Sequence, residues 1–126
     1  MGLTLPTASR NALADAVDDL VNAGSGPGYI QIRASTTVLG RVTCSDPAFG
    51  NASVGVITLS GTPLSGTATG TGTADNFKMY DSADVERVGG TVSLSGNGGD
   101  LILDNTSIVS GQTITITAGT ITMPGS

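Results

Sequence analysis

Few side chains in this sequence could carry out chemistry. The 126 residues include no histidine and one cysteine, Cys44. A serine–histidine–acid triad and an imidazole metal site both need histidine, and a thiolate zinc cluster needs more than one cysteine. One glutamate, Glu86, and four aromatic residues are also too few for the paired acids and sugar platforms of a glycosidase. We therefore expect a protein that is not an enzyme and that uses no cofactor or metal.

Two pairs of aspartates remain as candidates for a cation site. Asp81 and Asp84 bracket a predicted turn, and Asp100 and Asp104 flank the short apolar run 101–103. Carboxylate and backbone oxygens are the ligands that calcium prefers. Neither pair has the spacing of a D-x-[DN]-x-[DN]-G loop, and aspartate at strand ends commonly makes turns. A surface-displayed carbohydrate- or calcium-binding module is kept only as an alternative.

A glycine-rich segment, residues 60–74, contains a G-x-G at Gly70 and Gly72. Phosphate-binding loops of this kind lead into a helix or carry a following Lys-Ser/Thr, and this segment has neither. The pattern favours a threonine-rich strand or loop over a phosphate cradle.

One predicted helix, residues 7–23, has to be positioned against the rest of the chain. Its apolar residues recur at the i, i+3, i+4, i+7, i+8 spacing of one helix face. Thr7 or Ser9 is the expected N-cap, and Gly24 is the expected C-cap.

The remaining strands carry few large side chains, so we expect this helix to complete their core. The helix residues expected to pack inward are Leu13, Val17, Leu20 and Val21. The carboxylates of Asp15, Asp18 and Asp19 are expected to face solvent or a basic partner.

Alternating apolar and polar residues predict strands after residue 28. The expected strands are 29–33, 38–44, 54–59, 76–81, 85–88, 92–94, 101–103, 108–109, 113–117 and 120–123. The first two should form a hairpin, Phe77 and Met79 should point inward, and Cys44 should be a small core residue. The expected fold is mainly β, a β-sandwich or barrel-like, with one N-terminal amphipathic α-helix packed on it. We expect an extended arm, 1–6, and a single domain, 7–126, with its β-domain at 29–123.

The net charge is −5, and the five basic residues are scattered singly along the chain. We see no basic stripe for nucleic acid, no apolar run of transmembrane length and no signal peptide, so we expect no direct nucleic-acid or membrane partner. The small number of aromatic residues limits the core, and oligomerisation would add stability.

Four stretches carry a resemblance that covers nearly the whole chain. They are the LPT that opens the helix at 5–7, SDPAFG at 45–50, GGDLILDNTSI at 98–108 and GQTITIT at 111–117. With them the sequence resembles small virion structural proteins of tailed bacteriophages, most of all a capsid decoration (cement) protein. The resemblance implies a homotrimer on the capsid surface that stabilises the lattice of the major capsid protein and is made in the host cytoplasm. A tail, fibre or head–tail adaptor component is the alternative.

Three segments combine apolar residues with backbone that could pair with a neighbouring chain: the arm 1–6, the loop 46–51 and the last strand. The partner-contact candidates are Leu3, Leu5, Asp46, Pro47, Phe49, Asn51, Ile121 and Met123.

Overall fold

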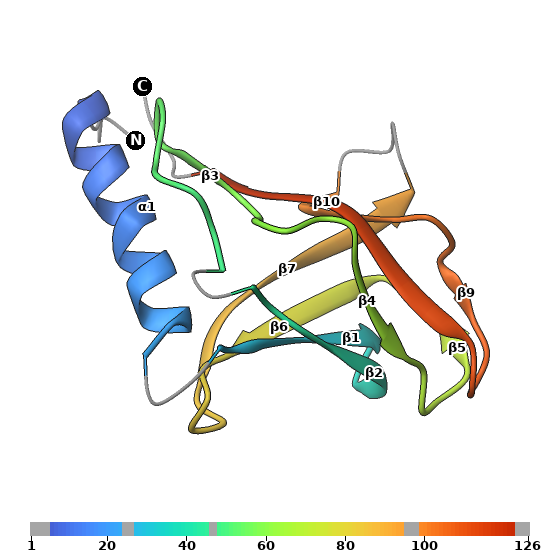
Figure 1. The fold of residues 1–126 in the computed structure, drawn as a ribbon. Helices are drawn as coiled ribbons and strands as arrows, with labels where there is room; N and C mark the ends of the chain where they lie inside the picture. Colours follow the sequence, from blue (N-terminus) through green and yellow to red (C-terminus); the bar gives the residue numbers. More distant parts are fainter. Residues whose placement is uncertain (1–5, 24–26, 46–47, 95–98, 123–126) are drawn as a thin grey trace.

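The computed structural model describes residues 6–23, 27–45, 48–94 and 99–122 (Figure 1). The elements, in chain order, are α1 (Thr7–Val21), β1 (Tyr29–Ala34), β2 (Thr37–Thr43), β3 (Val56–Thr58), β4 (Leu64–Thr67), β5 (Gly72–Thr73), β6 (Asn76–Tyr80), β7 (Glu86–Leu94), β8 (Leu101–Leu103), β9 (Ser107–Ile108) and β10 (Thr113–Thr122). The predicted class, mainly β with one N-terminal helix packed on the strands, is confirmed.

The strands form one eight-stranded sheet in the order β2-β1-β6-β7-β8-β10-β3, with β4 also paired to β10, beside a small β5-β9 pair. The β1–β2 hairpin is present as predicted. Neighbouring strands are antiparallel except β7 and β8, which run parallel from Val92 opposite Leu101 to Leu94 opposite Leu103.

The sheet closes on itself where β4 meets β2. Gly40 and Ala68 form a bridge, and the backbone N–H groups of Thr69 and Gly70 donate to the Leu39 carbonyl at 2.7 and 3.1 Å. A Cβ on Gly40 would lie 3.1 Å from the Thr67 carbonyl oxygen and 3.2 Å from Ala68 Cα, so this glycine allows the close approach of β2 and β4. The sheet is therefore barrel-like, with its core inside (Figure 1).

The core consists mostly of aliphatic side chains. Phe77 and Met79 are buried as predicted, and Cys44 is a buried free thiol whose pKa is raised to about 12 by desolvation. Phe49 is the other fully buried aromatic residue among the described residues.

Two strands are longer than the sequence predicts. β7 continues through Gly89 and Gly90, and β10 continues through Ala118 and Gly119, with a register shift against β8 between Ile116 and Ala118. Gly89 and Gly90 pair with Lys78 and Phe77 of β6, and Ala118 and Gly119 pair with Ile102 and Leu101 of β8, so both strands stay extended.

The helix α1 begins after Pro6, which occupies the N-cap without a side-chain cap bond, and ends at Val21 with Asn22, rather than the predicted Gly24, as its C-cap. Thr7 lies inside the first turn, where its hydroxyl accepts a hydrogen bond from Arg10 at 3.1 Å. The described residues include no helix that is both long and apolar enough to cross a membrane.

Candidate functional site

The inward face of α1 is narrower than predicted. Ala14 and Val21 are fully buried and Val17 packs against the core, whereas Leu13 and Leu20 are 46% and 42% exposed. The prediction that Leu13 and Leu20 complete the core is therefore wrong. The helix is rotated about its axis so that small residues face the sheet.

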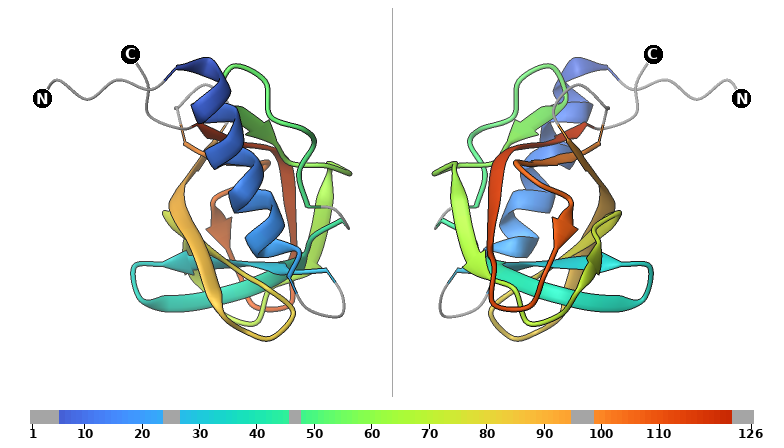
Figure 2. Two further views of the ribbon diagram at one scale, coloured as in Figure 1. Left: turned by 90° about the vertical axis from the view of Figure 1, so that its left-hand side faces the viewer. Right: turned by 90° about the vertical axis from the view of Figure 1, so that its right-hand side faces the viewer.

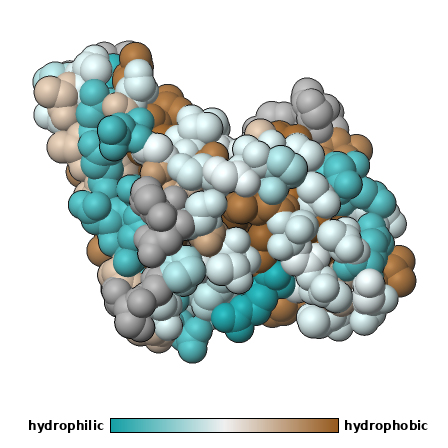
Figure 3. Space-filling model, viewed as in Figure 1, coloured by the Kyte–Doolittle hydropathy of each residue, from teal (hydrophilic) through white to brown (hydrophobic). Residues whose placement is uncertain are grey.

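A row of polar side chains explains this rotation. Their oxygens accept hydrogen bonds from backbone N–H groups of residues 48–55, which we call the strap. From the end of the helix to its start, the pairs are Asn22 with Ala48 (2.9 Å), Asp18 with Phe49 (3.0 Å), Asp15 with Ala52 (2.9 Å) and Asn11 with Gly55 (2.7 Å). The strap thus runs antiparallel to the helix. In Figure 3 the side of α1 that borders the strap is hydrophilic, in keeping with this row.

This row corrects the expectation for the helix aspartates. Asp15 and Asp18 both accept hydrogen bonds from the strap; Asp15 and Asp19 are exposed as predicted, whereas Asp18 is half-buried. Burial raises the pKa of Asp18, while hydrogen bonds from the Phe49 N–H and the Asn22 amide act against that rise.

The strap is bonded on its other side to β3. The N–H of Gly50 donates to the Thr58 carbonyl at 2.9 Å, and the N–H of Ser60 donates to the Ala48 carbonyl at 2.8 Å. The strap therefore lies between α1 and β3 and joins the helix to the sheet (Figure 2).

The predicted partner contacts divide into two groups. Leu3, Leu5, Asp46, Pro47 and Met123 lie outside the described residues.

Of the other three, Phe49 and Ile121 are 2% and 8% exposed, and Ile121 pairs with Ile57 inside the sheet. Their side chains belong to the core, which corrects the expectation that they face a partner. Asn51 is exposed on the strap, so it is the candidate that still lies on the surface.

The outward face of α1 presents apolar residues that nothing in the described part of the chain covers. Leu13, Ala16 and Leu20 are all exposed and lie on one side of the helix, within two turns. We call these three residues the helix stripe. Figure 2, left, looks onto this outer side of α1.

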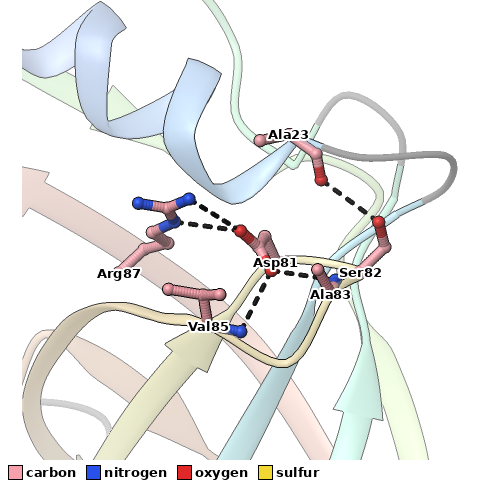
Figure 4. A network of polar contacts seen from close by, with 6 residues as sticks. All are labelled: Ala23, Asp81, Ser82, Ala83, Val85 and Arg87. Carbon is pink, nitrogen blue, oxygen red and sulfur yellow. Dashed lines mark hydrogen bonds and ion pairs between the residues drawn. The ribbon is translucent and has the colours of Figure 1, made fainter.

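The turn between β6 and β7 is built on the buried carboxylate of Asp81 (Figure 4). One oxygen accepts from the N–H groups of Ala83 (2.9 Å) and Val85 (3.0 Å), and the other accepts from Arg87 Nε (3.0 Å) and Nη2 (2.9 Å). The hydrogen bond from Val85 lowers the pKa of Asp81, with Arg87 and Ala83 adding to this effect against desolvation.

The same turn is fastened to the helix end, because the Ser82 hydroxyl donates to the Ala23 carbonyl at 3.2 Å.

The aspartate pairs considered for calcium have other partners. Both Asp81 oxygens face donors, Asp84 accepts the Tyr29 hydroxyl at 2.9 Å, and Asp100 accepts the Thr91 N–H at 3.0 Å. Asp104 is exposed. Within the described ranges, no group of three or more His, Cys, Asp or Glu side chains could hold a metal ion.

The G-x-G at Gly70 and Gly72 follows β4 rather than leading into a helix. A Cβ on Gly70 would lie 2.7 Å from the Val38 carbonyl, so this glycine allows a close approach to β2. The structure supports the strand interpretation of this segment.

The outer side of β1, β2 and β6 gathers residues that are far apart in the sequence. β1 lies between the other two strands; Gln31 is opposite Arg41 and Lys78, and Tyr29 is opposite Tyr80. The outward set, which we call the Tyr–Arg face, consists of Tyr29, Gln31, Arg33, Arg41, Lys78 and Tyr80.

The sequence suggested singly scattered basic residues, yet three of the five lie on this face. The period-two alternation marked Arg33 and Lys78 as outward-facing, but it gave no sign that β1 pairs with β6.

Comparison of the chain with protein-family models, with curated proteins and with solved structures found no match.

Proposed function

We propose that this chain is a non-enzymatic structural protein of a tailed-phage virion, a capsid decoration protein that binds and stabilises the lattice of the major capsid protein as a homo-oligomer. The resemblance of the sequence to virion structural proteins supports this proposal. The observation that carries it is the helix stripe, because Leu13 and Leu20 are both about half exposed along one side of the same helix.

The stripe has the form of a helix–helix contact. Its two leucines are seven residues apart with Ala16 between them, so they recur along one side of the helix and leave room for a close approach in the middle. Covering each half-exposed leucine would contribute about 1 kcal/mol. Contacts of this size are weak in one pair and add up over the many copies of a lattice.

Localisation on intact particles tests the function. Labelled antibody imaging or cryo-electron microscopy is expected to find the protein on the head shell, in a copy number fixed by the lattice. Detection on the tail alone would contradict a decoration role.

A binding measurement gives a second test. Shells of the encoding phage, assembled without this protein, are mixed with the purified chain and sedimented. We expect saturable co-sedimentation and a higher melting temperature for the loaded shells. Saturation without any change in shell melting would contradict the stabilising role.

A further inference from the structure

The Tyr–Arg face lies on a different side of the molecule from the helix stripe. β1, β2 and β6 form the lower side in Figure 1, whereas α1 stands along the left side. Behind the face, Ile30, Ile32, Phe77 and Met79 alternate with its members and are buried, which fixes the outward direction of the face.

Arg41 is held in place by aromatic stacking. Its guanidinium carbon lies 3.7 Å from the centre of the Tyr29 ring. The Tyr80 ring lies beside Tyr29, with 5.1 Å between centres and 12° between planes. The Tyr29 hydroxyl donates to Asp84 at 2.9 Å, which anchors the ring itself. An arginine ordered in this way loses little freedom when it binds a partner.

Within the described ranges, the guanidinium N–H groups of Arg41 form no hydrogen bond and no ion pair. The two ion pairs found there are Lys78 with Glu86 and Arg87 with Asp81, both at 2.9 Å, and Arg33 donates to the Thr36 carbonyl at 3.2 Å. Arg41 therefore presents an ordered, exposed guanidinium fork whose natural complement is a carboxylate or a phosphate group.

The charge distribution favours carboxylates on a protein. A nucleic-acid interface neutralises many phosphates at once, and this face has three basic residues in a chain of net charge −5. One of the three, Lys78, is already paired. Binding a few carboxylates on a protein surface requires only a small local cluster of basic residues. Tyrosine and arginine are also enriched among the residues that contribute most to binding at the centres of protein interfaces.

From these contacts we infer that the Tyr–Arg face docks onto a carboxylate-bearing surface of the shell protein, with Arg41 as its anchor. The inference rests on the proposed function and adds to it the side of the domain that faces the shell and the chemistry of that contact.

Sedimentation with shells of the encoding phage tests the inference with three variants. Arg41→Gln removes the charge, Arg41→Lys keeps the charge without the planar fork, and Thr58→Glu is the control. Thr58 is exposed on β3, on the opposite side of the molecule from β1, β2 and β6 in Figure 1, and its substitution changes the net charge by the same amount as Arg41→Gln. Circular dichroism and thermal melts establish that each variant is folded.

We expect Arg41→Gln to weaken shell binding by about tenfold or more, Arg41→Lys to lie between it and the wild type, and Thr58→Glu to bind within about twofold of the wild type. If the wild-type chain binds shells and Arg41→Gln binds them equally well, the inference is overturned and the proposed function still stands. An equal loss in Thr58→Glu would show an effect of total charge and would also overturn it.

Two further results would count against the inference. If the wild-type chain binds no shells, the proposed function fails and the inference fails with it. The same variants are also titrated with labelled single- and double-stranded DNA. DNA binding that depends on Arg41 would show that the Tyr–Arg face binds phosphate groups, and this would overturn the inference that it binds a protein surface.

Discussion

Leu20 and Val21 are neighbours in the sequence but lie in opposite environments, since Leu20 is 42% exposed and Val21 is fully buried. Leu20→Asp should therefore leave the isolated chain folded, with a melting temperature within a few degrees of the wild type, and should prevent assembly. Val21→Asp is the matched control and should unfold the chain, because it buries a charge without a partner. Thermal melts and shell sedimentation measure both effects. Equal destabilisation by the two substitutions would contradict the assignment of the helix faces.

Asp81 determines a pH dependence of stability. Its pKa is lowered in the folded state by the hydrogen bond from Val85 and by Arg87. A carboxyl group with a lowered folded pKa stabilises the fold fully above its unfolded pKa of about 3.9 and loses that contribution as the pH falls through the folded value.

We therefore expect Asp81→Asn to lower the melting temperature at pH 7 by several degrees and the difference from the wild type to shrink below about pH 4. Melting curves between pH 3 and pH 7 measure this, with the exposed Asp104→Asn as a control that should change little. A difference that is as large at pH 3 as at pH 7 would show that the charge of Asp81 is not its source.

At the scale of elements, the helix and the strap depend on each other through side-chain acceptors. Asp18→Ala leaves the partly buried N–H of Phe49 without its acceptor and should cost about 1–2 kcal/mol. Asp18→Asn keeps an oxygen at the same place and removes the carboxylate whose burial raises the pKa, so it should be as stable as the wild type or more stable. Urea unfolding of both variants measures this. Equal losses in the free energy of unfolding for Asp18→Ala and Asp18→Asn would mean that keeping an oxygen acceptor for the Phe49 N–H contributes little.

The existence of the helix was predictable from the sequence, but its rotation was not. Apolar residues spread over more than half of the helix circumference, so the pattern allowed several inward faces. The strap decided among them, because bonds from Asp15 and Asp18 to backbone N–H groups depend on a loop whose position the sequence does not encode locally. The strand around Phe77 and Met79 was predictable because apolar and polar residues alternate along it, which leaves one possible inward face.

At the scale of the whole molecule, the two proposed surfaces restrict the symmetry of an assembly. α1 runs crosswise to β1 and β2, which lie at one end of the molecule (Figures 1 and 2). Copies related by an axis parallel to α1 would meet through their helix stripes and turn all their Tyr–Arg faces to one side, as docking on a shell requires. A two-fold axis perpendicular to the helices would turn these faces in opposite directions.

Disulfide trapping distinguishes the two arrangements. Parallel helices bring Leu13 of neighbouring copies together, whereas antiparallel helices place Leu13 opposite Leu20 of the neighbour. We expect Leu13→Cys alone to form cross-linked copies on particles. Cys44 is buried and should not interfere. Cross-linking only in a mixture of Leu13→Cys and Leu20→Cys chains would indicate the antiparallel arrangement.

The mainly β class and the single helix followed from residue patterns, but the topology did not. The parallel pairing of β7 with β8 and the pairing of β1 with β6 join strands whose order no local signal records. The Tyr–Arg face is a product of that pairing, which brings Lys78 beside Gln31 and thereby near Arg41.

The bonds between α1 and the strap go to backbone N–H groups, which every residue except proline possesses. The helix thus holds the backbone of the strap and does not depend on the identity of the strap side chains. Exposed strap positions such as Asn51 are free to vary between related chains, or to accept residues chosen by an engineer, while the attachment stays the same. Proline at Phe49 or Ala52 is the exception, because it removes a donor from the row.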